Sequence, residues 1–186
     1  MMRTSFSARF QRGALLLEVL VTIVILAIGL LGLAGLQAKL QSSEMESYQR
    51  AQALILLNDM ASRIATNRNV ALDYVTATAL GAGMACPTAT STQTERDAAQ
   101  WCRALQGAAE TSGGNDVGAM VGGRGCVESA GTNTYMVTVA WQGLVPISAP
   151  PASVACGQGE YDTAGTSCIN DLCRRAITTI VRIATL

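Results

Sequence analysis

Six cysteines are the residues of this 186-residue chain with the clearest capacity for chemistry. Their spacings along the sequence are 16, 24, 30, 12 and 5 residues, and no two of them form a C-x-x-C pair. Structural zinc sites normally use such tight pairs, whereas an even number of scattered cysteines is typical of disulfide bonds. We therefore expect no metal site and three disulfides, formed by Cys86, Cys102, Cys126, Cys156, Cys168 and Cys173. The sequence does not determine which cysteine pairs with which.

The chain contains no histidine, the commonest general base and metal ligand in proteins. Ser-His-Asp catalysis, Cys-His catalysis and His-based zinc sites are therefore excluded. The acidic, serine and cysteine side chains of residues 70–186 show no catalytic spacing, so we expect no enzyme and no cofactor. Because 13 basic side chains are balanced by 13 acidic ones, no basic stripe for nucleic acid is expected either.

Several other polar and aromatic residues have a structural interpretation that outweighs a functional one. Asn115-Asp116 and Asn170-Asp171 offer oxygen ligands for calcium, but isolated pairs of this kind more often form turns. Arg174-Arg175 is expected at a solvated strand edge, where charge discourages unwanted pairing. Trp101 and Trp141 are expected in the core.

A single charge, Glu18, interrupts the apolar segment 14–36, in which 18 of 23 residues are apolar. As a helix this segment would be about 34 Å long, enough to cross the hydrocarbon of a bilayer. The preceding residues 1–13 carry three arginines and no acid, which predicts a cytoplasmic N-terminus. A cleaved secretory signal has a shorter apolar region and no carboxylate, so we expect a membrane helix instead.

The membrane helix is expected to continue outside the bilayer through residues 37–69, which contain neither proline nor glycine. Apolar residues recur there at three- and four-residue steps, which predicts an amphipathic helix that packs on a globular domain. The predicted apolar face consists of Leu54, Leu57, Met60, Ala61 and Ile64.

Residues 70–186 are expected to form that domain, with mixed helix and strand. Thr92 and Glu95 fit a capping box ahead of a helix over 95–109, and 111–125 is expected to be a glycine-rich loop. Strands are predicted over 135–141 and 175–183 from their β-branched and aromatic residues. Between these strands, 143–173 contains three prolines and three cysteines, which predicts a long loop held by disulfides.

The residues from Arg12 to Glu18 resemble the class III signal of type IV prepilins: a basic leader, a glycine, four apolar residues and a glutamate. The resemblance implies that prepilin peptidase cleaves between Gly13 and Ala14 and methylates Ala14, and that Glu18 is the glutamate used in filament assembly. Two departures are Ala14, where the family usually has phenylalanine, and the absence of a proline in the membrane helix. Gly29, Gly32 and Gly35 would either loosen that helix or let neighbouring helices pack closely.

The sequence is identified as similar to the PilV family of minor pilins, the type IV pilus modification proteins, over roughly residues 1–70 and more loosely near 137–141 and 174–175. The resemblance implies an α+β pilin fold: a long N-terminal helix packed on an antiparallel sheet, with a disulfide-linked C-terminal loop. The implied parts are a cleaved leader (1–13), a transmembrane and filament-core helix (14–36), its amphipathic continuation (37–69) and a periplasmic domain (70–186).

The resemblance also implies a function and partners. PilV-type subunits join other minor pilins in a priming complex, help the major pilin to polymerise, and sit near a tip adhesin. The expected partners are these pilins, prepilin peptidase and the inner-membrane assembly platform of a Gram-negative bacterium. A minor pseudopilin of a type II secretion system is the nearest alternative, since it shares the signal. A periplasmic enzyme or sensor anchored by one uncleaved helix is a third.

Overall fold

The computed structural model describes residues 12–108, 111–112, 115–116, 118 and 120–184, of which 12–15, 111–112 and 115–116 are described by their backbone alone. The chain divides into two compact units, Met1–Glu44 and Met45–Leu186. One helix, α1 (Arg12–Thr66), contributes to both of them. The second unit also contains the other helices, the strands and the loops.

The part of α1 in the second unit is amphipathic, with a buried face that differs slightly from the predicted one. Gln49, Ala53, Leu57, Met60 and Ile64 are buried at steps of three and four residues. The inclusion of Leu54 in this face was wrong, because that side chain is 43% exposed and Ala53 faces the core instead.

The end of α1 also corrects the predicted helix boundary. The helix ends at Thr66 rather than at residue 69, and the 3-10 helix η1 (Arg68–Tyr74) follows it. Asn67 lies between the two helices with φ −100° and ψ 39°, outside the helical region. Its side-chain amide donates a hydrogen bond to the Tyr74 hydroxyl at 2.7 Å, which holds the turn closed.

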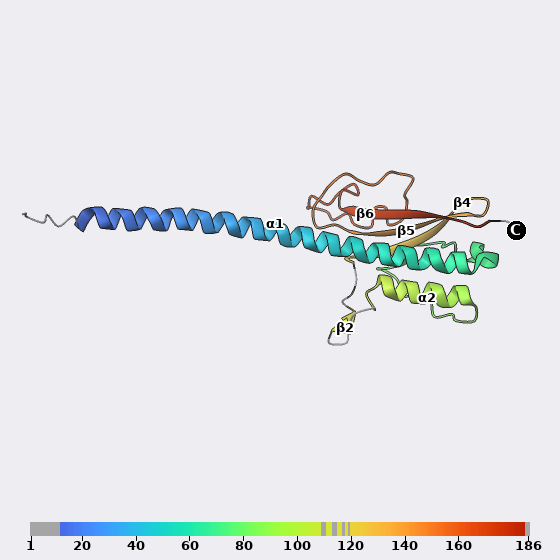
Figure 1. Cartoon of the computed structure of the whole chain (residues 1–186). Helices are drawn as coiled ribbons and strands as arrows, with labels where there is room; N and C mark the ends of the chain where they lie inside the picture. The colour runs from blue at the N-terminus through green and yellow to red at the C-terminus, as the bar shows by residue number, and fades with distance from the viewer. Residues whose placement is uncertain (1–11, 109–110, 113–114, 117, 119, 185–186) are drawn as a thin grey trace, which may run out of the picture. The chain divides into compact units, whose positions relative to one another are not determined.

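A four-stranded antiparallel sheet forms the centre of the second unit, in the order β1-β4-β5-β6 (Figure 1). Its strands are β1 (Leu80–Gly81), β4 (Arg124–Gly131), β5 (Thr134–Gln142) and β6 (Arg174–Arg182). The last two confirm the predicted strands to within one residue at each end. Strand β4 was not predicted. The expected loop 111–125 was partly wrong, because it contains the short strands β2 (Thr111–Ser112) and β3 (Asn115–Asp116) and the first two residues of β4.

Strand alternation gives the sheet two differently covered faces. Tyr135, Val137, Val139 and Trp141 belong to the core cluster that includes the buried residues of α1 and α2. On the opposite face, the loop 143–173 approaches Ala140 through Gly157 and is tied to β4 by the Cys126–Cys156 disulfide. No helix or strand lies within this fully described loop, as predicted.

Helix α2 (Gln93–Leu105) starts with the predicted capping box: Thr92 Oγ1 accepts from the Glu95 N–H, and the Glu95 carboxylate accepts from the Thr92 N–H. It ends at Leu105, four residues before the predicted boundary. Trp101 is fully buried and its indole N–H donates to the Leu56 carbonyl of α1 at 2.9 Å. Gly125 of β4 makes room for this indole, because a Cβ there would overlap the Trp101 ring.

Candidate functional site

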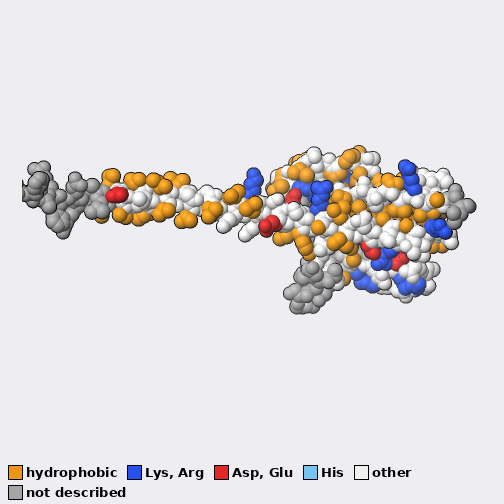
Figure 2. All heavy atoms as spheres, in the orientation of Figure 1, with side chains coloured by type: hydrophobic (Ala, Val, Ile, Leu, Met, Phe, Trp, Pro, Cys, Tyr) orange, Lys and Arg blue, Asp and Glu red, His pale blue; other side chains and the backbone are white. Residues whose placement is uncertain are grey.

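The first unit of the chain presents an apolar helix surface. Every described side chain from Leu16 to Glu44 is exposed, and exposure reaches 74% at Leu16 and 73% at Leu31. Figure 2 shows hydrophobic side chains along the N-terminal part of α1. By length and composition, this helix can cross a membrane. A helix with apolar side chains exposed over this length needs lipid or other helices around it.

Glu18 is the one charged side chain between Leu16 and Leu36. Among the side chains that the structure describes, none forms an ion pair or a side-chain hydrogen bond with it, so its charge is unmatched within that part of the chain. An unmatched carboxylate in a bilayer costs about 2.5–3.5 kcal/mol at the centre and less near the interface. A positively charged group from another molecule would offset that cost.

The predicted cleavage and methylation positions stand at the beginning of α1. Gly13 and Ala14 lie in its first turn, where the structure describes the backbone alone, and residues 1–11 of the predicted leader lie outside the described residues. Ala14 and Glu18 are four residues apart, one helical turn, so they lie on the same side of the helix. The glycines Gly29, Gly32 and Gly35 lie farther along this helix, and a Cβ at any of them would meet no atom within 4 Å.

The six cysteines form three disulfide bonds. Cys86–Cys102 joins the segment before α2 to that helix, Cys126–Cys156 joins β4 to the loop 143–173, and Cys168–Cys173 closes a small loop ahead of β6. Each bond therefore fixes a segment that has little regular structure of its own. Within the described residues, no three acidic or cysteine side chains gather as a metal site would require.

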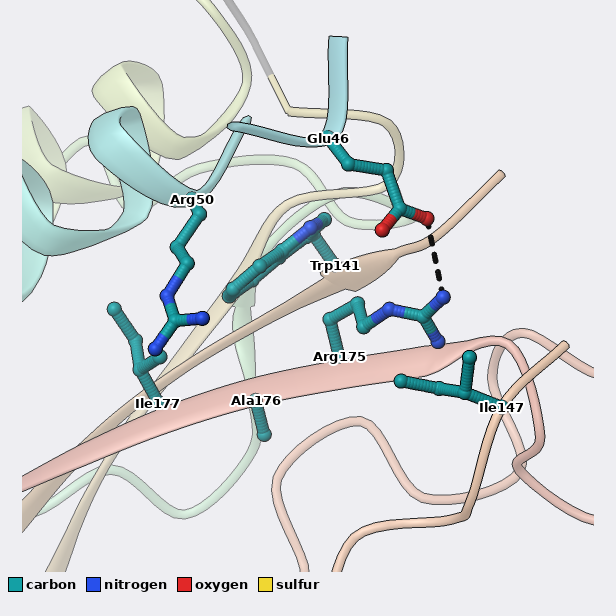
Figure 3. Close-up of a pocket in the computed structure, with 7 residues that line it drawn as sticks. All are labelled: Glu46, Arg50, Trp141, Ile147, Arg175, Ala176 and Ile177. Carbon is teal, nitrogen blue, oxygen red and sulfur yellow. Dashed lines mark hydrogen bonds and ion pairs between the residues drawn. The ribbon is translucent and has the colours of Figure 1, made fainter. Parts of the chain in front are cut away.

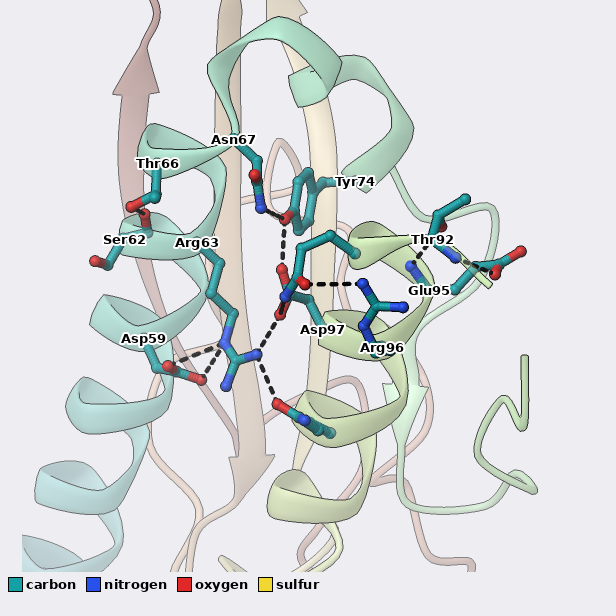
Figure 4. Close-up of polar contacts among 12 residues, drawn as sticks. Asp59, Ser62, Arg63, Thr66, Asn67, Tyr74, Thr92, Glu95, Arg96 and Asp97 are labelled. Carbon is teal, nitrogen blue, oxygen red and sulfur yellow. Dashed lines mark hydrogen bonds and ion pairs between the residues drawn. The ribbon is translucent and has the colours of Figure 1, made fainter. Parts of the chain in front are cut away.

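A polar cluster joins the end of α1 to α2 (Figure 4). Arg63 Nε donates to both oxygens of Asp59 at 3.0 Å, and its Nη1 donates to Asp97 Oδ1 at 2.5 Å. The other Asp97 oxygen accepts from the Tyr74 hydroxyl at 2.5 Å. Asp97 is only 2% exposed, and this network satisfies its charge.

The network shifts the protonation of its members. Burial opposes ionisation of Asp97, but hydrogen bonds from Tyr74, Arg63 and Gln93 outweigh it and hold the Asp97 pKa below its ordinary value. Burial and the hydrogen bond to the Asp97 carboxylate raise the pKa of Tyr74 to about 12. Asp97 therefore stays ionised and Tyr74 stays protonated through the physiological range, and their hydrogen bonds join α1 and η1 to α2.

Arg174 and Arg175 correct the expectation of a solvated strand edge. Arg174 is 1% exposed and donates to the Val154 and Cys156 carbonyls at 2.6 and 3.1 Å, beneath the loop 143–173. Arg175 points to the helix side, where it donates to Glu46 of α1 at 3.1 Å. The two arginines therefore fasten opposite faces of the sheet. Sequence reasoning missed this because a charged dipeptide gives no sign of distant carbonyl partners.

The two Asn-Asp pairs lie in different settings. Asn170 and Asp171 have φ values of 54° and 62°, the left-handed region that Asn and Asp tolerate in turns, and this agrees with the predicted turn. Asp171 also pairs with Arg174 at 3.2 Å and accepts from the Gly159 N–H. Asn115 and Asp116 form β3, whose side chains lie outside those described.

Both tryptophans are buried, as predicted: Trp101 is 0% and Trp141 4% exposed. Tyr161, which sequence reasoning did not single out, donates to the Gly122 carbonyl at 2.9 Å and lies under the Arg124 guanidinium. Burial raises the pKa of Tyr161 to about 12. This contact holds the loop 143–173 against the start of β4.

Comparison of the chain with known protein families, with curated proteins and with solved structures gave no match.

Proposed function

We propose that the chain is a minor pilin of the type IV pilus with the character of the PilV family, a structural subunit of the filament rather than an enzyme. The observation that carries the proposal is Glu18, a carboxylate without a charged partner among the described side chains, near the start of an exposed apolar helix and five residues beyond Gly13. The long N-terminal helix, the antiparallel sheet and the disulfide-bonded loop are compatible with a pilin layout.

In this proposal prepilin peptidase removes residues 1–13 at the cytoplasmic face, and the subunit waits in the inner membrane with its domain in the periplasm. On assembly, the apolar part of α1 exchanges lipid for the helices of neighbouring pilins. The methylated amine of a neighbouring subunit pairs with Glu18 and sets the register between helices, because an unpaired carboxylate is costly there. The subunit primes polymerisation with other minor pilins, near the filament tip.

The N-terminus of the membrane form tests this function directly. Mass spectrometry of the purified chain should find a methylated N-terminus at Ala14, and the chain should be present in sheared filaments. An intact Met1 would contradict the proposal and favour an anchored periplasmic protein. Presence in a secretion pseudopilus in place of a surface pilus would favour the minor pseudopilin, which shares the signal.

Replacement of Glu18 by Ala tests the assembly step. The Glu18→Ala chain should still insert in the membrane and be cleaved, since the apolar segment is unchanged, but its incorporation into filaments should fall. Glu18→Asp is the matched variant that keeps the charge on a shorter side chain. Filament number and composition that do not change in Glu18→Ala would contradict the role of this residue.

A further inference from the structure

We propose that a pocket beside Arg50 receives a carboxylate side chain from a neighbouring subunit. This inference rests on the proposed function, which supplies neighbouring subunits, and it names the chemistry that one of them presents. The pocket lies entirely within the second unit, between α1 and the end of the sheet. Its lining residues are Glu46, Arg50, Trp141, Ile147, Arg175, Ala176 and Ile177 (Figure 3).

Arg175 is held in a fixed position at one side of this pocket. Its guanidinium donates to the Val145 carbonyl at 2.7 Å and to the Glu46 carboxylate at 3.1 Å. Gly143 makes room for it, because a Cβ at that position would overlap the guanidinium. Arg175 therefore has its partners inside the chain and forms a wall of the pocket.

Arg50 is the positive charge that the fold leaves available. Glu46 precedes it by four residues on α1, the spacing at which a glutamate normally pairs with an arginine. That glutamate instead accepts from Arg175 and from the Leu144 N–H at 3.1 Å. Arg50 is exposed, and within the described residues no hydrogen bond or ion pair engages it. In Figure 3 its guanidinium lies below the Trp141 ring and beside Ile177.

The charge and size of the pocket favour a single carboxylate. Two arginines and one glutamate give the pocket a formal charge of +1, which one carboxylate neutralises. A guanidinium presents parallel N–H donors that match the two oxygens of a carboxylate. The volume is about 240 Å³, which suits a side chain and falls below the roughly 300–1,000 Å³ of sites for drug-sized ligands.

The surroundings of the pocket indicate that a protein segment carries this carboxylate. Ile147 lines the pocket and is 51% exposed, and the adjoining Val145 and Leu144 are 51% and 45% exposed. Met45, next to Glu46, is 53% exposed. An exposed arginine next to exposed apolar side chains is typical of the centre of a protein interface, where arginine is enriched and apolar area is buried. The occupant is therefore an Asp or Glu flanked by apolar residues on a neighbouring pilin.

The test uses the full chain in producing cells, with a photo-crosslinking amino acid in place of Ile147 as the probe. Crosslinked peptides are mapped by mass spectrometry, and Arg50→Gln and Arg50→Glu are compared with Arg68→Glu, which makes the same charge change at an exposed arginine outside the pocket. The crosslink should map to a filament protein within a few residues of an Asp or Glu. Its yield should fall about tenfold in Arg50→Glu and stay unchanged in Arg68→Glu.

Reciprocal exchange of charge gives the decisive result. Changing the mapped Asp or Glu of the partner to Arg should restore the crosslink of Arg50→Glu to within about twofold of the original yield. The pocket proposal is overturned if no crosslink forms, if only lipid is captured, or if the yield does not depend on the charge at residue 50. Circular dichroism of each variant establishes that a lost crosslink does not reflect a lost fold.

The same experiment separates failure of the pocket from failure of the proposed function. If sheared filaments contain the original chain but the crosslink yield is the same in Arg50→Glu, only the pocket proposal is overturned. Filaments that lack the chain, together with a charge-dependent crosslink to another protein, overturn the filament function and support the carboxylate pocket with a different partner.

Discussion

Arg63 and Asp97 form an ion pair with 2.5 Å between Nη1 and Oδ1, which links α1 to α2 across 34 residues of sequence. Asp97 is almost fully buried, whereas Arg63 keeps a quarter of its side chain exposed. Tyr74 and Asn67 extend the pair to the turn after α1. One buried carboxylate therefore connects the second helix both to the first helix and to the turn that follows it.

Replacement of that carboxylate should destabilise the domain. In Asp97→Asn the Arg63 charge loses its buried partner and the Tyr74 hydroxyl loses a charged acceptor, which should cost about 2–3 kcal/mol. Urea unfolding of the detergent-solubilised chain, followed by the fluorescence of its two buried tryptophans, measures the change. Asp73→Asn, an exposed aspartate in η1, is the matched control and should stay within about 0.5 kcal/mol.

The same pair predicts the acid side of the stability profile. The pKa of folded Asp97 lies below its ordinary value of 3.8, so the unfolded chain binds a proton first as the pH falls. The stabilisation is complete above pH 3.8 and is lost as the pH falls from there through the folded pKa. The urea midpoint of the original chain should fall more steeply in this window than that of Asp97→Asn. If the urea midpoints of the two chains fall in parallel over this pH window, the lowered pKa of Asp97 is contradicted.

Arg174 should be required for the order of the loop 143–173. Arg174→Met removes the donors to the Val154 and Cys156 carbonyls and leaves Asp171 without its ion pair, at a cost of about 2–3 kcal/mol. Limited proteolysis should then cut within the loop at low protease concentration. Arg182→Met, at the exposed end of the same strand, should leave the digestion pattern unchanged.

The three disulfides should contribute unequally. Their sequence separations are 30 for Cys126–Cys156, 16 for Cys86–Cys102 and 5 for Cys168–Cys173. Restriction of the unfolded chain predicts contributions of about 3.6, 3.1 and 2.1 kcal/mol in that order. Paired Cys→Ser replacements, compared by urea unfolding, test the ranking. Mass analysis of the alkylated, non-reduced chain should also find no free thiol.

Gly125 should not accept a side chain. Gly125→Ala places a methyl group against the Trp101 ring, and the fully buried indole must shift, at a cost of about 1–3 kcal/mol. Near-ultraviolet circular dichroism should report the altered tryptophan environment, and urea unfolding the lost stability. Ser129→Ala, on an exposed position of β4, should change neither signal.

The parts of the fold that sequence patterns predicted are those with local causes. Thr92 and Glu95 are three residues apart, so their capping box can be found without tertiary information, and the β-branched run around Val137 identifies β5. Strand β4 escaped prediction because Gly125 and Gly131 are poor strand formers. It is stabilised by pairing with β5 and by the Trp101 contact, and neither is visible locally.

The same distinction applies to the candidate sites. Glu18 stands out because its charge contrasts with neighbouring residues in the sequence. The pairing of the cysteines was not predictable, since it depends on which loop covers which face of the sheet. The pocket beside Arg50 also escaped notice, because Glu46 and Arg175 are 129 residues apart.

The opposite orientations of Arg174 and Arg175 also favour one register for the last strand, β6. A slip of β6 by one position would send every side chain to the other face of the sheet. It would put the shielded guanidinium of Arg174 among the apolar side chains beneath the helices and withdraw Arg175 from Glu46. A register shift by one residue would therefore both bury an unpaired charge and break an ion pair. The two adjacent arginines therefore select the correct register of β6 against β5.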